Sequence, residues 1–145
     1  MSSYVVVDLD GTLCDCTHRE HHAQNREWDE FHSKLHLDEP NKDVRMVVEA
    51  LSEYGATIIA CTGRPHKYRA ETLKWIAQWE IPIDDLLMRP DEDFRSDVEI
   101  KLDLLMNRIN GDKEAVTLIL EDREKVIEMW RNNGFRCWAV TMGAY

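Results

Sequence analysis

The sequence has few of the features that mark membrane or disulfide-rich proteins. No stretch approaches the roughly 20 consecutive apolar residues that a membrane-spanning helix needs, and the first four residues, MSSY, carry no basic flank or long apolar run. Cysteines stand only at Cys14, Cys16, Cys61 and Cys137 and lack CxxC spacing, so neither a disulfide framework nor a cysteine-ligated zinc site is expected. These absences predict a soluble, cytoplasmic protein with reduced thiols and no membrane association.

Basic residues are also scarce, since 18 lysines and arginines face 28 acidic residues and the net charge is −10. Proteins that bind nucleic acid along its length usually present a basic surface. Any contact with a polynucleotide is therefore expected to be local and short. A length of 145 residues fits one domain, 1–145, with one substantial core, and no internal repeat is present.

The apolar run at residues 4–7, YVVV, leads directly into Asp8, Asp10 and Gly11. The run shows no period-2 alternation, which is typical of a strand covered on both faces. If the chain stays extended, the two carboxylates share a side, and Gly11 then allows a turn. Carboxylates held this close repel each other unless a proton or a cation separates them, and a hard divalent ion suits them. An acidic turn after a core strand is the simpler alternative.

Strands and helices alternate along the chain. Strands are predicted at 4–7, 56–61, 86–88, 115–120 and 135–140, and helices at 40–55, 65–79, 97–110 and 123–133. This order favours a mainly parallel five-stranded sheet with helices on both faces. Ligands bind such sheets beyond the carboxyl ends of the strands. Asp8, Thr62 and Asp122 each follow an apolar strand, so we expect one cleft to contain all three.

The polar segment at about 14–38 is predicted to be a small cap inserted outside the core. A short helix is expected at 25–35, with Trp28, Phe31 and Leu35 on one face. Five histidines are crowded into the segment, but their spacing matches no recognised zinc ligand set, so solvated or substrate-facing histidines are the favoured interpretation: His18, His21, His22, His32 and His36. The aromatic residues of the helix at 65–79 are expected to pack rather than to stack on bases.

Four separated pieces resemble the motifs of the haloacid dehalogenase (HAD) superfamily of phosphotransferases. Asp8-Leu9-Asp10-Gly11-Thr12 resembles the nucleophile loop, and the other three motifs are matched in order by Thr62, Lys101 and Asp122. Taken singly, Thr62 could cap a helix, Lys101 could be a solvated charge, and Glu121-Asp122 could be an acid pair at a helix start. Together they imply the three-layer, Rossmann-like α/β core of the superfamily.

The resemblance implies a role for each residue. Asp8 would attack phosphorus to give an aspartyl-phosphate, and Asp10 would protonate the leaving oxygen and then take a proton from water. Repulsion from Asp8 would raise the pKa of Asp10. Thr62 and the Gly63 amide would hydrogen-bond the phosphoryl group, and Lys101 would pair with its oxygens and with Asp8.

A bound Mg²⁺ is implied as well. Its ligands would be Asp8, Asp122 and the backbone carbonyl of Asp10. Glu121 stands where related sequences have a second aspartate, so we expect it to support the metal site.

The C-terminal part resembles more narrowly the phosphatase domain of the bacteriophage polynucleotide kinase/3′-phosphatase family. The resemblance rests on Glu128-Met129-Trp130-Arg131, Gly134, Cys137-Trp138, Val140 and Gly143. It implies removal of a 3′-phosphate from a polynucleotide end or a nucleotide, in the host cytoplasm for a phage protein. It also implies that Arg19 and Arg64 clamp phosphate and that Asp97, four residues before Lys101, supports the site.

Besides Glu121 in place of an aspartate, two further differences from that family limit the inference. Thr62 replaces a serine, and no GxxxxGK[ST] loop occurs, so kinase activity is not expected of this sequence. A phosphatase of mononucleotides or other small metabolites, or a non-catalytic binder of phosphorylated nucleotides, stays open as an alternative. Trp28 and His32 could meet base or sugar, but no spacing rule gives their direction. No obligate protein partner is evident.

Overall fold

The computed structural model describes residues 3–140 and contains a five-stranded parallel sheet. Its strands are β1 (Tyr4–Val7), β4 (Thr57–Pro65), β5 (Asp85–Arg89), β6 (Val116–Glu121) and β7 (Cys137–Ala139). They lie in the order β5-β4-β1-β6-β7, and every neighbouring pair is parallel. The predicted sheet is confirmed, and β1 is its central strand.

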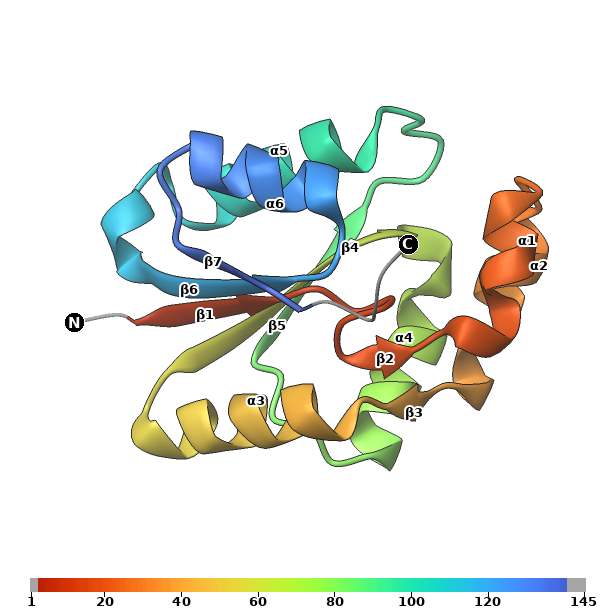
Figure 1. Cartoon of the computed structure of the whole chain (residues 1–145), viewed down its shortest axis with the longest axis horizontal. Helices are drawn as coiled ribbons and strands as arrows, with labels where there is room; N and C mark the ends of the chain where they lie inside the picture. The colour runs from red at the N-terminus through yellow and green to blue at the C-terminus, as the bar shows by residue number, and fades with distance from the viewer. Residues whose placement is uncertain (1–2, 141–145) are drawn as a thin grey trace.

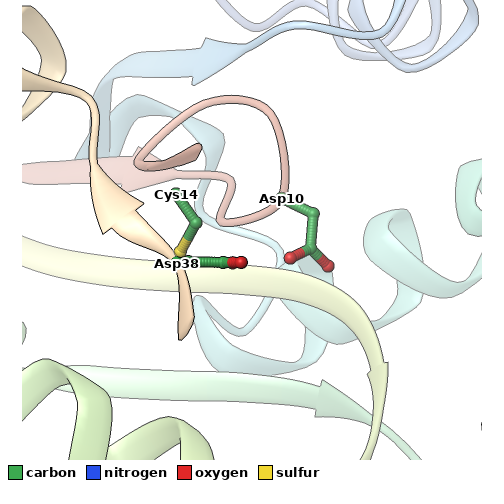
Figure 2. Close-up of side chains that lie close together, drawn as sticks. All are labelled: Asp10, Cys14 and Asp38. Atoms are coloured by element: carbon green, nitrogen blue, oxygen red, sulfur yellow. The ribbon is translucent and has the colours of Figure 1, made fainter. Parts of the chain in front are cut away.

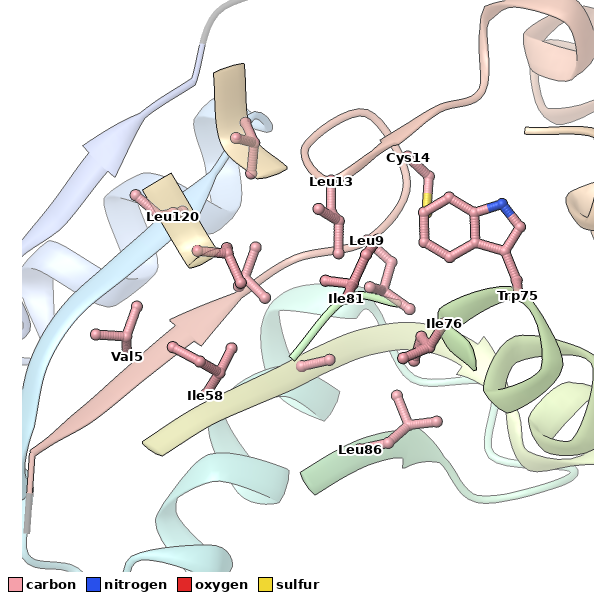
Figure 3. Close-up of a cluster of buried hydrophobic side chains, with 14 of the residues drawn as sticks. Val5, Leu9, Leu13, Cys14, Ile58, Trp75, Ile76, Ile81, Leu86 and Leu120 are labelled. Atoms are coloured by element: carbon pink, nitrogen blue, oxygen red, sulfur yellow. The ribbon is translucent and has the colours of Figure 1, made fainter. Parts of the chain in front are cut away.

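Helices cover both faces of the sheet, as Figure 1 shows. One face is covered by α3 (Lys42–Tyr54) and α4 (Arg69–Gln78), and the other by α5 (Asp97–Arg108) and α6 (Glu124–Asn132). Val5 and Val7 belong to the hydrophobic cluster between the sheet and helices α3 and α4, and Figure 3 shows part of this cluster. Val6 belongs to the cluster on the α5 and α6 side. Both faces of β1 are therefore buried, which explains its uninterrupted apolar run. The three-layer fold is confirmed.

Several element boundaries differ from the prediction. β4 does not end at Cys61 but continues to Pro65, and a 3₁₀ turn, η3 (His66–Tyr68), precedes α4. Another 3₁₀ turn, η4 (Lys113–Ala115), leads into β6. The predicted strand at 135–140 is shorter, and Gly143 lies outside the described residues. Among residues 3–140, no helix combines the length and apolar character needed to cross a membrane.

The insertion is enclosed by a short antiparallel pair, β2 (Cys14–Asp15) and β3 (Glu39–Pro40). Between them lie η1 (Thr17–Arg19), α1 (Glu20–Gln24), α2 (Trp28–Ser33) and η2 (Leu35–Leu37). Figure 1 shows α1 and α2 beyond the carboxyl end of β1. The helix predicted at 25–35 is present as the shorter α2, which begins after Arg26 because that residue has a φ of 58°, outside the α-helical range, and Leu35 lies in the following 3₁₀ turn.

The insertion is also less separate from the core than expected. Cys14 belongs to the hydrophobic cluster under α3 and α4, and Arg19, Leu35 and Asp38 are buried. The base of the cap is thus part of the packed interior, and only its outer helices are solvated.

Candidate active site

Three carboxylates meet at the carboxyl ends of β1 and β6. Asp8 directly follows β1, Glu121 ends β6, and Asp122 follows it. Their nearest oxygen atoms lie within 4.8 Å of one another. The register pairs Val7 with Leu120, so the two strands deliver these acids at the same level of the sheet.

Lys101 reaches this acidic cluster from α5. Its Nζ donates to Asp8 Oδ1 at 2.9 Å and to Glu121 Oε1 at 2.7 Å, and the residue is buried. The structure therefore brings together Asp8 and Asp122, which the strand pattern placed in one cleft, and Lys101, which only the family resemblance had pointed to. Glu121 has a further use, because its Oε2 accepts from the backbone amides of Asp122 and Arg123 at 3.1 and 3.3 Å. Its carboxylate thus positions both the lysine and the turn that follows β6.

The loop after β1 is shaped around the same cluster. The Thr12 hydroxyl lies 2.8 Å from Asp8 Oδ2 and 3.2 Å from Asp122 Oδ1. Thr12 is therefore a site residue, although the sequence motif that contains it predicted no role for it. Gly11 has a φ of 84°, and a Cβ there would collide with the Asp122 carboxylate. A glycine is therefore required both by the backbone and by the close approach of Asp122.

Negative charge exceeds positive charge in this cluster, because the carboxylates of Asp8, Glu121 and Asp122 face the single amine of Lys101. Burial, and then the charge of Asp8, raise the pKa values of Glu121 and Asp122. Burial alone would lower the pKa of Lys101, but Asp8 and Glu121 raise it well above its ordinary value. Oxygen donors from three carboxyl groups beside a single amine fit a hard divalent cation.

Asp10 points into a different environment, in which two arginines bind its carboxylate. Arg19 Nη2 donates to Asp10 Oδ1 at 2.5 Å, Arg64 Nη2 to the same oxygen at 2.7 Å, and Arg64 Nε to both oxygens at 3.2 Å. Burial would raise the pKa of Asp10, but Arg64 and Arg19 lower it below its ordinary range. The prediction of a raised pKa is wrong, because it considered Asp8 and overlooked the arginines.

Asp38 completes this second cluster. Arg19 donates to its two oxygens through Nε at 2.8 Å and Nη2 at 2.6 Å, and His18 Nε2 lies 2.7 Å from Oδ1. Asp10, Cys14 and Asp38 lie close enough to suggest a metal site (Figure 2), but the guanidinium groups already occupy the space that their oxygens face. No sequence signal identified Asp38, which lies at the end of the insertion.

The arginines were expected to clamp phosphate, and in the structure their guanidinium groups contact other parts of the protein. Arg19 and Arg64 are almost fully buried. Arg19 also donates to the carbonyl of Phe31 at 3.0 Å, and Arg64 to the Thr72 hydroxyl at 3.1 Å. Their donors are thus directed to Asp10, to Asp38 and to the protein around them.

The C-terminal part of β4 carries the second motif. Thr62 is buried, and its Oγ1 accepts from the Arg64 amide at 3.1 Å. Arg89 Nε donates to the Gly63 carbonyl at 2.8 Å, and its Nη2 donates to the carboxylate of Asp97. A Cβ at Gly63 would collide with Asp97. Asp97 therefore packs on the Thr62-Gly63 backbone, and Arg123 also donates to it.

The histidines of the insertion lie outside the two clusters of potential metal ligands in the described part of the chain. His22 pairs with Glu27, and His32 is buried on α2. The cysteines are buried and free, as predicted: Cys14, Cys16, Cys61 and Cys137.

Comparison with known families decides the relationship. Residues 2–145 match the family described as the polynucleotide kinase PNKP phosphatase domain. The chain belongs to this family. The HAD-type architecture and the narrower resemblance to polynucleotide kinase phosphatase domains are thereby confirmed.

Individual relatives agree with this phosphatase-domain family. A protein of Autographa californica nuclear polyhedrosis virus, described as a bifunctional polynucleotide kinase/RNA ligase, is 33% identical over 130 residues, which are 88% of this chain and 18% of that protein. A chain of the Pnkp1/Rnl/Hen1 RNA repair complex is 32% identical with a TM-score of 0.86, covering all of this chain and 44% of that one. This chain thus spans less than half the length of these relatives.

More distant structures share the fold alone. The HAD-hydrolase YfnB from Bacillus subtilis, described as bound to magnesium, has a TM-score of 0.72 at 11% identity, over 99% of this chain and 90% of that one.

Proposed function

We propose that this phosphatase domain is a magnesium-dependent phosphomonoesterase that removes a 3′-phosphate from polynucleotide ends through an aspartyl-phosphate. The observation that carries the proposal is the convergence of Asp8, Lys101 and Asp122, with Lys101 Nζ 2.9 Å from Asp8 Oδ1. A nucleophilic carboxylate beside a buried cation is what phosphoryl transfer to an aspartate needs.

The first half-reaction uses Asp8 as nucleophile. One carboxylate oxygen of Asp8 attacks phosphorus, and the bond from phosphorus to the sugar oxygen breaks with its electron pair leaving on that oxygen, which takes a proton from the protonated form of Asp10. Lys101, the Thr62 hydroxyl and the Gly63 amide stabilise the charge on the remaining phosphoryl oxygens. Water then attacks the same phosphorus, the bond to Asp8 breaks, and inorganic phosphate leaves.

Asp10 is the proposed proton carrier between these steps. In its ion-paired form it is ready to take the proton of the attacking water. The proton gained there is the one that the next leaving oxygen needs. Because Arg19 and Arg64 hold the carboxylate on two sides, we propose that they position Asp10 and do not bind phosphate themselves.

The acidic cluster fits Mg²⁺. Asp8, Asp122 and the backbone carbonyl of Asp10 would hold the ion, and Glu121 would support it indirectly through Lys101 and the turn after β6. When bound, the ion supplies positive charge that lets an anionic phosphate approach an anionic nucleophile.

The substrate assignment is supported by the family and by the similarity to a chain of an RNA repair complex. The net charge of −10 favours one alternative, a phosphatase of mononucleotides or small metabolites. A non-catalytic binder is a third possibility, which turnover would exclude.

A substrate panel tests the proposal. We expect Mg²⁺-dependent phosphate release, highest on 3′-phosphorylated oligonucleotides and lower on 5′-phosphorylated ones, nucleoside monophosphates and sugar phosphates. Asp8→Asn should lower the rate by about 1,000-fold or more, because a carboxamide is a poor nucleophile. Asp112→Asn, an exposed aspartate before β6, serves as the control and should retain full activity. An Asp8→Asn protein as active as its parent would end the mechanism.

A further inference from the structure

Three aromatic rings form a row across the cap and the segment after β4. Trp28 and His32 lie one turn apart on α2, with ring centroids 6.4 Å apart and planes inclined by 26°. His32 in turn contacts Tyr68 of η3, with centroids 5.0 Å apart. Trp28 is the outer member, with 53% of its surface exposed, whereas His32 is only 8% exposed. Trp28 therefore presents a large aromatic surface to solvent, and the buried His32, which contacts Tyr68, supports it on the other side.

Two sets of contacts connect the row to the candidate active site, one through Phe31, which precedes His32 on α2, and one through Tyr68. Arg19, which binds Asp10, also donates to the Phe31 carbonyl of α2, and its guanidinium carbon lies 4.3 Å from the centre of the Phe31 ring. In the second set, the Tyr68 carbonyl accepts from the Thr72 hydroxyl at 2.8 Å, and that hydroxyl accepts from Arg64, the second arginine on Asp10. The arginines that hold Asp10 thus also fix the aromatic row beside it.

His32 adds an independent indication of a ligand. Its Nδ1 is buried and has no hydrogen-bond partner within the described part of the chain. Buried polar atoms are almost always paired, by protein, water or ligand. Burial lowers the pKa of His32 to about 4, so the neutral ring has one donor and one acceptor nitrogen.

We propose that Trp28, His32 and Tyr68 form the subsite for the terminal nucleoside of the substrate. The base stacks on the exposed surface of Trp28, and the His32 imidazole hydrogen-bonds to the sugar or the base. This inference rests on the proposed function. It also explains how an acidic protein can hold a polynucleotide end, because base stacking needs no basic surface and accepts every base.

The alternative is that Trp28 merely packs the cap. It contacts Phe31 edge-on, with ring centroids 6.0 Å apart, and this contact would stabilise α2 without any ligand. A packing role affects every substrate alike, whereas a stacking role affects only substrates with a base. Activity measured on substrates with and without a base therefore distinguishes the packing role from the stacking role.

The experiment compares three substrates: an oligonucleotide with a 3′-phosphorylated terminal nucleotide, the same oligonucleotide with an abasic 3′-phosphorylated terminus, and a sugar phosphate, which has no aromatic ring. For Trp28→Ala we expect kcat/KM to fall about 10-fold on the first substrate, the size of one base–aromatic stack. The other two substrates should change by less than about twofold, and Trp28→Phe should restore most of the loss. Tyr54→Ala, an exposed aromatic at the opposite end of the sheet, is the matched control and should change nothing.

The outcomes separate this inference from the proposed function. Equal losses on all three substrates, or no loss on the first, would overturn the stacking subsite while phosphatase activity stood. Failure of the parent protein to hydrolyse any of the three would overturn the proposed function, and the subsite with it. Thermal denaturation of each variant shows whether the cap mutation has unfolded the protein.

Discussion

Arg64 contacts three side chains near the loop that follows β1. Its guanidinium contacts Asp10 through two nitrogens, the Thr72 hydroxyl through a third, and the Cys14 sulfur at 3.6 Å. This planar fork fixes the angle of the Asp10 carboxylate as well as its position. At the scale of the residue, we therefore expect mutation of Arg64 to act mainly by changing the orientation of Asp10, the proposed proton carrier.

We expect Arg64→Lys to lower kcat by about 10- to 100-fold while KM changes by less than about threefold, because one ammonium group cannot span Asp10 and Thr72 together. Steady-state kinetics on a 3′-phosphorylated oligonucleotide measures both constants. Arg45→Lys, at a half-exposed pair with Glu49 on α3, is the control. A large rise in KM with unchanged kcat would show instead that Arg64 binds the phosphate.

The residues of the acidic cluster were predictable, whereas their neighbours were not. Asp8 and Asp122 follow apolar strands, and parallel strands end at one edge of the sheet, so the pattern places them together. Lys101 was predicted as a site residue only from the family motif. Asp38 carries no such signal, because its partner Arg19 is 19 residues away and the irregular insertion between them has no period. Long-range pairing of this kind depends on packing that a sequence pattern does not encode.

At the scale of the element, the turn after β1 depends on the absence of a side chain at Gly11. Gly11 and Gly111 share a positive φ, 84° and 76°, but only at Gly11 would a Cβ meet another residue, Asp122. Comparing alanine substitutions at these two glycines therefore distinguishes the effect of backbone strain from the effect of a steric collision.

Gly111→Ala should cost about 1–2 kcal/mol of stability from strain alone and leave activity intact. Gly11→Ala should lose a similar amount and, in addition, most phosphatase activity, since the added methyl displaces the Asp122 carboxylate. Urea denaturation and phosphate-release assays on both variants measure the difference. Equal activity in the two variants would show that Asp122 tolerates displacement.

The elements themselves were predictable to different degrees. The strands of the main sheet are apolar runs buried on both faces, and the flanking helices have a regular apolar face, so both gave clear patterns. The cap did not, because α1 has five residues and none of them is buried. A left-handed residue, Arg26, separates α1 from α2, and no pattern of apolar residues reveals such a residue.

At the scale of the whole molecule, the uncompensated charge of the acidic cluster should couple metal binding to folding. We expect Mg²⁺ at about 100 times its dissociation constant to raise the free energy of unfolding by about 2.7 kcal/mol. Asp122→Asn should abolish most of this increase, whereas Asp112→Asn should retain it. Urea denaturation with and without Mg²⁺ measures the effect. Identical midpoints for the parent protein in both conditions would refute a metal site in the native state.

The net charge of −10 leads to a prediction on salt. If one or two phosphates of a single strand are contacted, kcat/KM on a 3′-phosphorylated oligonucleotide should fall about threefold to sevenfold between 50 and 200 mM salt. A nucleoside 3′-monophosphate should respond less. Equal responses of the two substrates would favour the mononucleotide alternative.

Arg19 joins the cap helix α2 to the acid on the catalytic loop through a single guanidinium group, which reaches the Phe31 carbonyl on one side and Asp10 on the other. The two parts are consequently coupled mechanically. We expect a substrate that displaces α2 to shift Arg19 and, with it, the carboxylate of Asp10, the proposed proton carrier, so that substrate fit and the orientation of this carboxylate change together.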